Sequence, residues 1–275
     1  MGFTPFKDSY RYLNFLIIFL LTLLLLYLII PLFISGTIKI WVNISELDGA
    51  AGYFSLKIGM IMEIILMGPV FGIIYYFLMK SLIKNVDENQ GRNKYVLYFL
   101  EIGVLLFINI SVMGHIVHLL FDYGNWIYRE SNVMDTSQLY LFLYYSDEWL
   151  GHHLIHIAFF GYITLALITE FIGQEHRKLN SDELIYTIAS GVGLSVVFSY
   201  YTYEGQAAFM IFILFILLLI IEIIILFIKK INPLERPILL ATIITSIVVI
   251  IFFICWIILF GIKPYYPFVY QPSEL

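Results

Sequence analysis

The feature that most limits the fold of this chain is a series of long apolar stretches separated by short polar linkers. A transmembrane helix needs about 20 consecutive apolar residues, and a helix satisfies its backbone hydrogen bonds within the segment, as hydrocarbon requires. We place seven such stretches at Leu13–Ile34, Ser55–Met79, Tyr95–Phe121, Trp149–Phe171, Leu184–Tyr201, Ala207–Ile228 and Ile238–Ile262. The sequence therefore predicts an all-α, polytopic membrane bundle with seven transmembrane helices.

Charged residues are scarce along the whole chain. They make up 13% of its 275 residues, whereas 61% are hydrophobic. A soluble domain carries roughly 25% charged residues, so the composition is typical of a multi-pass protein of the cell membrane. No linker is long enough for a soluble domain, and we expect residues 1–275 to form a single integral membrane domain. The net charge of −5 argues against a nucleic-acid partner.

The distribution of basic residues predicts the orientation of the helices. If the N-terminus is cytoplasmic, the inner side holds 11 of the 15 Lys and Arg residues and the outer side holds four, as the positive-inside rule requires. The inner residues are Lys7, Arg11, Lys80, Lys84, Arg92, Lys94, Arg177, Lys178, Lys229, Lys230 and Arg236, and the outer ones are Lys39, Lys57, Arg129 and Lys263. We therefore expect a cytoplasmic N-terminus and a C-terminus on the outside.

Histidines are concentrated in one part of the chain, between Ser111 and His156. Five of the six lie there, at His115, His118, His152, His153 and His156. Ionisable side chains at membrane depth are costly, and they commonly mark a functional site. One such histidine can simply hydrogen-bond to a neighbouring helix, but five on two adjacent predicted helices favour a shared site.

Helical spacing places these side chains on two faces. The third predicted helix carries, on one face, Ser111, His115, His118 and Asp122. The fourth carries, on one face, Glu148, His152 and His156. At 1.5 Å per residue, His115 and His156 lie about 10 Å below the outer ends of their helices, and Glu63 of the second helix lies about 12 Å below its own. Three helices thus place a metal-binding side chain at one depth near the extracytoplasmic face.

Imidazole and carboxylate groups without thiolate suit zinc, iron, copper or manganese; Cys255, the only cysteine, provides no thiolate site. A catalytic zinc needs about three protein ligands and an open position for water. We expect these ligands to be His115, His152 and His156, with His118 or Glu63 as alternatives. Asp122 or Glu148 would then act as the general base. A site near the outer leaflet suits a lipid or lipid-linked substrate.

Three further residues are expected to surround the site rather than to bind the ion. His153 lies about 100° around the helix from His152 and faces a neighbouring helix or the headgroups. Asp147 lies with Glu148 at the predicted membrane boundary, where solvated carboxylates cost little and also suit the first turn of a helix. Glu204 lies in the outer turn between the fifth and sixth helices.

The motifs Ser111-x3-His115 and His152-x3-His156, with Asp122 between them, resemble the signature of a family of seven-span, zinc-dependent membrane hydrolases. That family includes the alkaline ceramidases and the progestin and adipoQ receptors. The resemblance implies a zinc ion held by His115, His152 and His156, with Ser111 and Asp122 beside the water, and hydrolysis of lipid amide bonds. The chain departs from the family because its second histidine pair lies in the fourth span rather than the last. Its Asp is also closer to the first histidine, and its site faces outside rather than the cytoplasm.

Other functions fit the same residues. His115 or His118 opposite His152 or His156 would suit a b-type haem and electron transfer. His118 with His152 and His153 resembles the histidine boxes of membrane di-iron oxidoreductases, which carry more histidines on the cytoplasmic side. A transporter, receptor or scaffold with a polar outer vestibule is the non-enzymatic alternative. Membrane lipids are the expected partners in every case, and no sequence feature indicates an oligomeric state.

Overall fold

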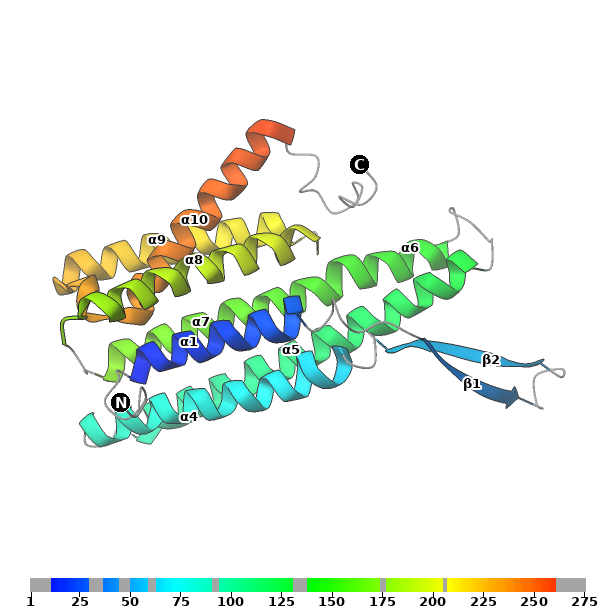
Figure 1. Cartoon of the computed structure of the whole chain (residues 1–275), viewed down its shortest axis with the longest axis horizontal. Helices are drawn as coiled ribbons and strands as arrows, with labels where there is room; N and C mark the ends of the chain where they lie inside the picture. Colours follow the sequence, from blue (N-terminus) through cyan, green and yellow to red (C-terminus); the bar gives the residue numbers. More distant parts are fainter. Residues whose placement is uncertain are drawn as a thin grey trace.

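The chain folds into long helices that lie side by side, and the computed structural model describes residues 11–29, 37–44, 50–58, 63–90, 94–130, 138–173, 177–204 and 207–260 (Figure 1). Six helices in the described part are long and apolar enough to cross a membrane: Ile65–Lys84, Lys94–Asn125, Phe142–Gly173, Ser181–Tyr200, Ala208–Lys229 and Pro237–Leu259. The predicted helical, integral membrane fold is thereby confirmed. The first apolar stretch forms a shorter helix over Arg11–Tyr27, so a seventh crossing stays a prediction, as do the orientation and the cell membrane.

In the described part of the chain the helical segments are interrupted by two strands, which lie between η1 (Leu24–Ile29) and η2 (Glu63–Val70). In chain order they are α1 (Arg11–Leu23), η1 (Leu24–Ile29), η2 (Glu63–Val70), α4 (Phe71–Gln90), α5 (Lys94–Glu130), α6 (Gln138–Tyr145), η3 (Ser146–Gly151), α7 (His152–Gly173), α8 (Ser181–Glu204), α9 (Ala208–Lys229), η4 (Pro233–Glu235) and α10 (Pro237–Phe260). The segments η1, η2 and η3 are π-helical, and η4 is a 3-10 turn.

A β-hairpin lies before the second long helix. It includes Ser55, the residue at which the sequence predicts that helix to begin. Strand β1 (Thr37–Ile44) pairs antiparallel with β2 (Ala50–Lys57), with Thr37 opposite Lys57 and Ile44 opposite Ala50. The β-branched and aromatic residues of β1, TIKIWVNI, favour a strand. Residues 55–57 therefore belong to a strand, and the predicted helix start at Ser55 is wrong.

The third and fourth spans are longer than the sequence predicts. Helix α5 continues to Glu130 instead of ending near Phe121, and α6, η3 and α7 form one unbroken helix from Gln138 to Gly173. At 1.5 Å per residue, the 37 residues of α5 cover about 55 Å, against roughly 30 Å of hydrocarbon. This antiparallel pair extends past the other helices, at the end of the bundle from which the hairpin also projects (Figure 1).

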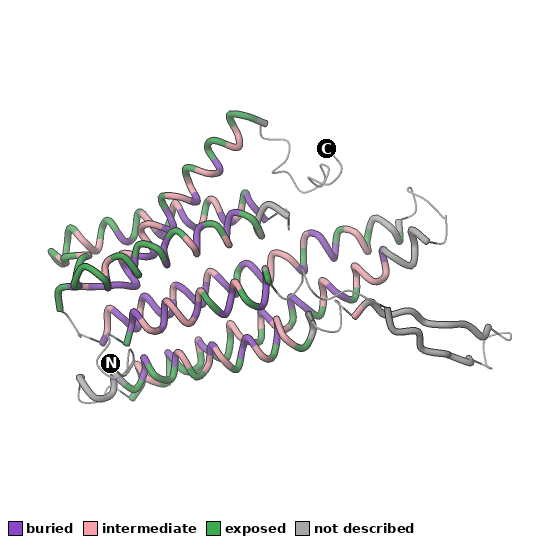
Figure 2. Tube along the Cα trace, in the orientation of Figure 1, coloured by how far each residue is buried: buried purple, intermediate pink, exposed green. Residues whose placement is uncertain are grey.

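Aromatic side chains form the centre of the core where α1, α4 and α7 meet. The ring of Phe71 lies 5.8 Å from that of Phe19 and 5.5 Å from that of Phe159. The Tyr75 hydroxyl donates a hydrogen bond to the Tyr162 carbonyl oxygen over 3.0 Å. Buried residues follow the facing sides of neighbouring helices, and exposed residues cover the outer sides (Figure 2). This core fixes the helices that carry the histidines.

Candidate metal site

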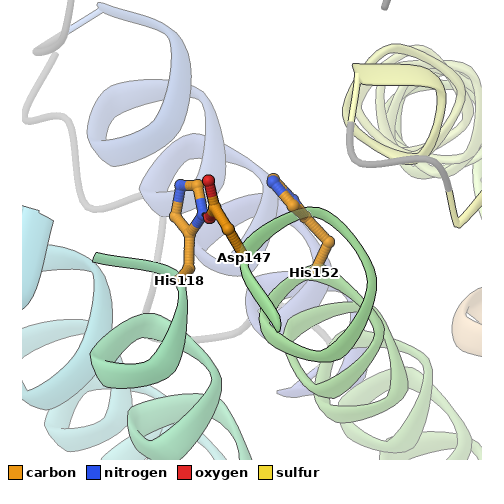
Figure 3. Close-up of side chains that lie close together, drawn as sticks. All are labelled: His118, Asp147 and His152. Carbon is orange, nitrogen blue, oxygen red and sulfur yellow. The ribbon is translucent and has the colours of Figure 1, made fainter. Parts of the chain in front are cut away.

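Two histidines and one aspartate converge between α5 and the η3–α7 helix (Figure 3). His118 lies on α5, Asp147 in η3 and His152 at the start of α7. One ring nitrogen from each histidine and one carboxylate oxygen of Asp147 all lie within 4.8 Å of one another. We call these residues the His118–Asp147–His152 group. It is the one group of this kind among the residues that the structure describes.

The three side chains contact one another directly. His118 Nδ1 lies 2.5 Å from Asp147 Oδ1, and the ring centroids of His118 and His152 are 4.3 Å apart. The His152 Nε2 atom lies 3.8 Å from Glu148 Oε2. A zinc ion binds nitrogen and oxygen ligands at about 2.0–2.2 Å, so two of its ligands lie at most about 4.4 Å apart. Small side-chain rotations would bring all three ligand atoms onto one ion, and the donor set fits a divalent metal.

The π-helical turn explains why Asp147 and His152 lie on the same side. Residues five apart in an α-helix differ by about 140° around the axis, which would turn Asp147 away from His152. In a π-helix the hydrogen bonds join residues five apart, so such residues lie one above the other. The prediction applied α-helical spacing and therefore grouped Glu148, rather than Asp147, with His152.

Close packing of two glycines brings α5 against η3 and α7. A Cβ atom on Gly151 would lie 2.8 Å from both the backbone nitrogen and the Cα of His118, and one on Gly114 would lie 2.8 Å from the backbone nitrogen of Ile155. Small residues permit such close approach of membrane helices. The contact at Gly151 places the backbone of His118 directly beside the turn that carries Asp147.

Asp147 and Glu148 are buried, which corrects the prediction that they are solvated at the membrane boundary. Their exposed fractions are 2% and 7%. The prediction was wrong because the helix begins at Gln138 and not at Trp149, so both acids lie inside a packed helix. A buried carboxylate needs hydrogen-bond partners, and Asp147 receives them from His118 and from the side-chain amide of Asn125, at 3.3 Å.

Sequence reasoning missed Asn125, although its position carried a signal. It lies seven residues after His118 on α5, which is two turns along the same face. The predicted end of this helix near Phe121 placed Asn125 in a loop, where the spacing had no meaning. Its side-chain amide now holds the second oxygen of Asp147 in place.

His115 serves a different contact, one turn below the group on α5. Its Nε2 atom lies 2.9 Å from the hydroxyl of Tyr27 in η1, and that hydroxyl donates to the Met67 carbonyl oxygen over 3.0 Å. Because the hydroxyl hydrogen points to Met67, His115 Nε2–H is the donor to Tyr27. His115 thus joins α5 to η1 and η2 within the core, and it lies outside the His118–Asp147–His152 group.

His156 and His153 also lie outside the group. The His156 ring is 6.3 Å from that of His152, at an interplanar angle of 19°, and it borders a small apolar void of about 10 Å³ beside Tyr27. His153 turns away, as its spacing predicts, and its Nδ1–H donates to the Trp149 carbonyl oxygen over 2.6 Å.

Two further predicted site residues, Ser111 and Asp122, are not part of the group. Ser111 is fully buried on α5, and Asp122 is half-buried on the same helix. The side chains of Glu63 and Glu204 lie outside the described residues.

The group lies far from the end of the bundle where α4, α7 and α9 end and α5, α8 and α10 begin (Figure 1). That end carries basic residues at Lys94, Lys229 and Arg236. At 1.5 Å per residue, His118 lies about 36 Å along α5 from Lys94, and the hydrocarbon core is about 30 Å thick. The group therefore lies toward the opposite end of the bundle, and its depth in a membrane stays a prediction.

Comparisons of the chain with protein-family models, with curated proteins and with solved structures found no match.

Proposed function

We propose that this chain is a membrane-embedded, divalent-metal-dependent hydrolase that acts on a lipid or lipid-linked substrate at the His118–Asp147–His152 group. The observation that carries the proposal is the convergence of two imidazoles and a buried carboxylate within 4.8 Å. Two histidines and one carboxylate form a known ligand set of catalytic zinc, which leaves a fourth position open. A bound zinc ion would supply Lewis acidity and activate water.

The surroundings of the group give each residue a distinct role. His118 and His152 are the nitrogen ligands, Asp147 is the oxygen ligand, and Asn125 holds Asp147 in position. Glu148, 3.8 Å from His152, is the general base. It accepts a proton as water adds to the substrate carbonyl, and it returns that proton to the leaving amine or alcohol as the bond to the carbonyl breaks.

Access from the lipid phase supports a lipid substrate. The His118 and His152 side chains are 20% and 19% exposed, whereas that of Asp147 is 3% exposed. The polar bond of a lipid substrate would reach these partly exposed imidazoles from the surrounding lipid.

The proposal keeps the zinc and lipid substrate implied by the resemblance to the seven-span hydrolases but changes the ligands. His118 and Asp147 replace His115 and His156 beside His152. A non-haem iron oxidoreductase is the second candidate, because two histidines and one carboxylate also suit Fe(II). The 4.3 Å between the His118 and His152 rings argues against a b-type haem between them, since the haem plane would need that space.

The first test is the metal content of purified protein and of four variants. We expect one zinc per chain in the wild type and its loss in His118→Ala, Asp147→Asn and His152→Ala. His153→Ala is the matched control, because His153 lies beside His152 but is outside the group and donates to Trp149 in its own helix. Equal zinc in all five proteins would overturn the ligand assignment.

The second test is hydrolysis of fluorescent lipid amides and esters by protein reconstituted in liposomes. Glu148→Gln should retain zinc and lose hydrolysis, since it removes only the base. Iron in place of zinc, with no hydrolysis by the iron form, would favour the oxidoreductase. No metal in any preparation would favour a transporter, receptor or scaffold.

A further inference from the structure

A cavity of about 770 Å³ lies between α7, the end of α9 and the turn that leads from α9 into α10, at the end of the bundle opposite the His118–Asp147–His152 group. This volume is within the range of about 300–1,000 Å³ that is usual for small-molecule sites. Its apolar wall is formed by Ile168, Phe171, Ile172 and Ile225. We call it the α7–α9–α10 pocket.

Basic side chains line the polar part of this pocket. Lys229 ends α9, Lys230 follows it with a left-handed φ of 51°, and Arg236 directly precedes α10. All three line the cavity, together with one carboxylate, that of Glu235. The Glu235 carboxylate accepts a hydrogen bond from the Asn232 side chain at 3.1 Å. The lining is therefore net positive.

The turn that carries these charges is held rigidly. The Asn232 side chain accepts the Leu234 N–H over 3.1 Å, and the Leu234 carbonyl oxygen accepts the Leu179 N–H of the neighbouring linker over 3.0 Å. Such bonds fix the loop after Lys230 against the linker between α7 and α8. The backbone that carries Lys229 and Lys230 is thus fixed in position.

Arg236 is anchored in the wall of the pocket. It is 6% exposed, its Nη1 donates to the Glu170 carbonyl oxygen over 2.9 Å, and its guanidinium lies 5.1 Å from the centre of the Phe171 ring. The Glu170 carboxylate accepts the backbone N–H groups of Ile238 and Leu239 at the start of α10. These contacts fix a positive charge beside the apolar wall.

From this arrangement we propose that the α7–α9–α10 pocket binds an anionic phospholipid. The phosphate lies between Lys229 and Lys230 near Arg236, and one acyl chain lies along the apolar wall. Basic pockets between transmembrane helices bind anionic headgroups. The lysines at the end of α9 would face the headgroup, and Ile225, one turn further into the helix, would face the acyl chain. The site is separate from the metal group and does not depend on it.

The experiment measures lipid binding to the purified full-length protein by native mass spectrometry. Phosphatidylglycerol is compared with phosphatidylcholine of the same acyl chains, in the wild type and in the Lys229→Gln/Lys230→Gln double variant. Two lysines near a charged headgroup, at about 1 kcal/mol each, correspond to about a thirtyfold loss of phosphatidylglycerol affinity. Phosphatidylcholine binding should not change.

A matched control uses Lys80→Gln/Lys84→Gln, which removes two exposed lysines from the last part of α4 at the same end of the bundle. It should keep wild-type binding. Ile225→Trp, which narrows the pocket without changing its charge, should weaken binding of both lipids. Equal loss in the two double variants, no preference for the anionic lipid, or displacement of the lipid by millimolar inorganic phosphate would overturn the proposal.

Discussion

Gly151→Ala tests whether close helix packing creates the metal site, because it changes no proposed ligand. The new methyl group would lie 2.8 Å from the backbone nitrogen and Cα of His118. Ordinary contacts begin near 3.4 Å, so α5 and η3 must separate locally by about 0.6 Å. This displacement exceeds the change of about 0.2 Å that metal–ligand distances tolerate. Overpacking of this kind costs about 1–3 kcal/mol. We expect zinc affinity to fall at least tenfold.

The assay is competition for zinc against a chelator of known affinity, on protein that elutes as a single species. The control is Gly103→Ala on the neighbouring helix α5, where the new methyl group meets only the flexible side chain of Leu165, at 3.1 Å. Both substitutions gain the same helix propensity. Unchanged zinc affinity in Gly151→Ala would refute the account of how the site forms.

Three further outcomes are expected. Asp147→Ala removes the acceptor of the buried Asn125 amide and of the partly buried His118 ring, so it should destabilise the fold by about 2–3 kcal/mol in thermal unfolding; stability equal to wild type would contradict this. Tyr27→Phe removes the hydroxyl that joins His115 to Met67 and should cost about 1–2 kcal/mol, yet keep full zinc content, which elemental analysis checks. Acidification should release zinc, because protons compete for the imidazole nitrogens, and raising the pH should restore it; pH-independent retention would exclude histidine ligands.

The sequence predicted the helices best where apolar residues run without interruption. The predicted spans Ala207–Ile228 and Ile238–Ile262 lie close to α9 and α10. The hairpin was missed because the prediction relied on apolar stretches, and β-branched and aromatic residues form such stretches in strands as well as in helices. The extension of α5 and the continuity of α6 with α7 were missed, because the tyrosines and acids of these segments resemble an interfacial region.

For the site, the sequence named the region in which the group lies and two of its three members. It named His118 and His152 among the metal ligands, but placed Asp147 only in the surroundings. The π-helical turn that rotates Asp147 toward His152 has no clear mark in the sequence. The partner of His115 could not be deduced, because Tyr27 lies 88 residues away along the chain and only tertiary packing joins them.

X-ray absorption spectroscopy of the zinc-loaded protein tests the central claim most directly, since it measures the ligands of the ion itself. We expect two imidazole nitrogens and at least one oxygen at about 2.0–2.2 Å, with one imidazole lost in His118→Ala and one in His152→Ala. A wild-type spectrum without imidazole, or spectra that these substitutions leave unchanged, would contradict a metal site at the His118–Asp147–His152 group.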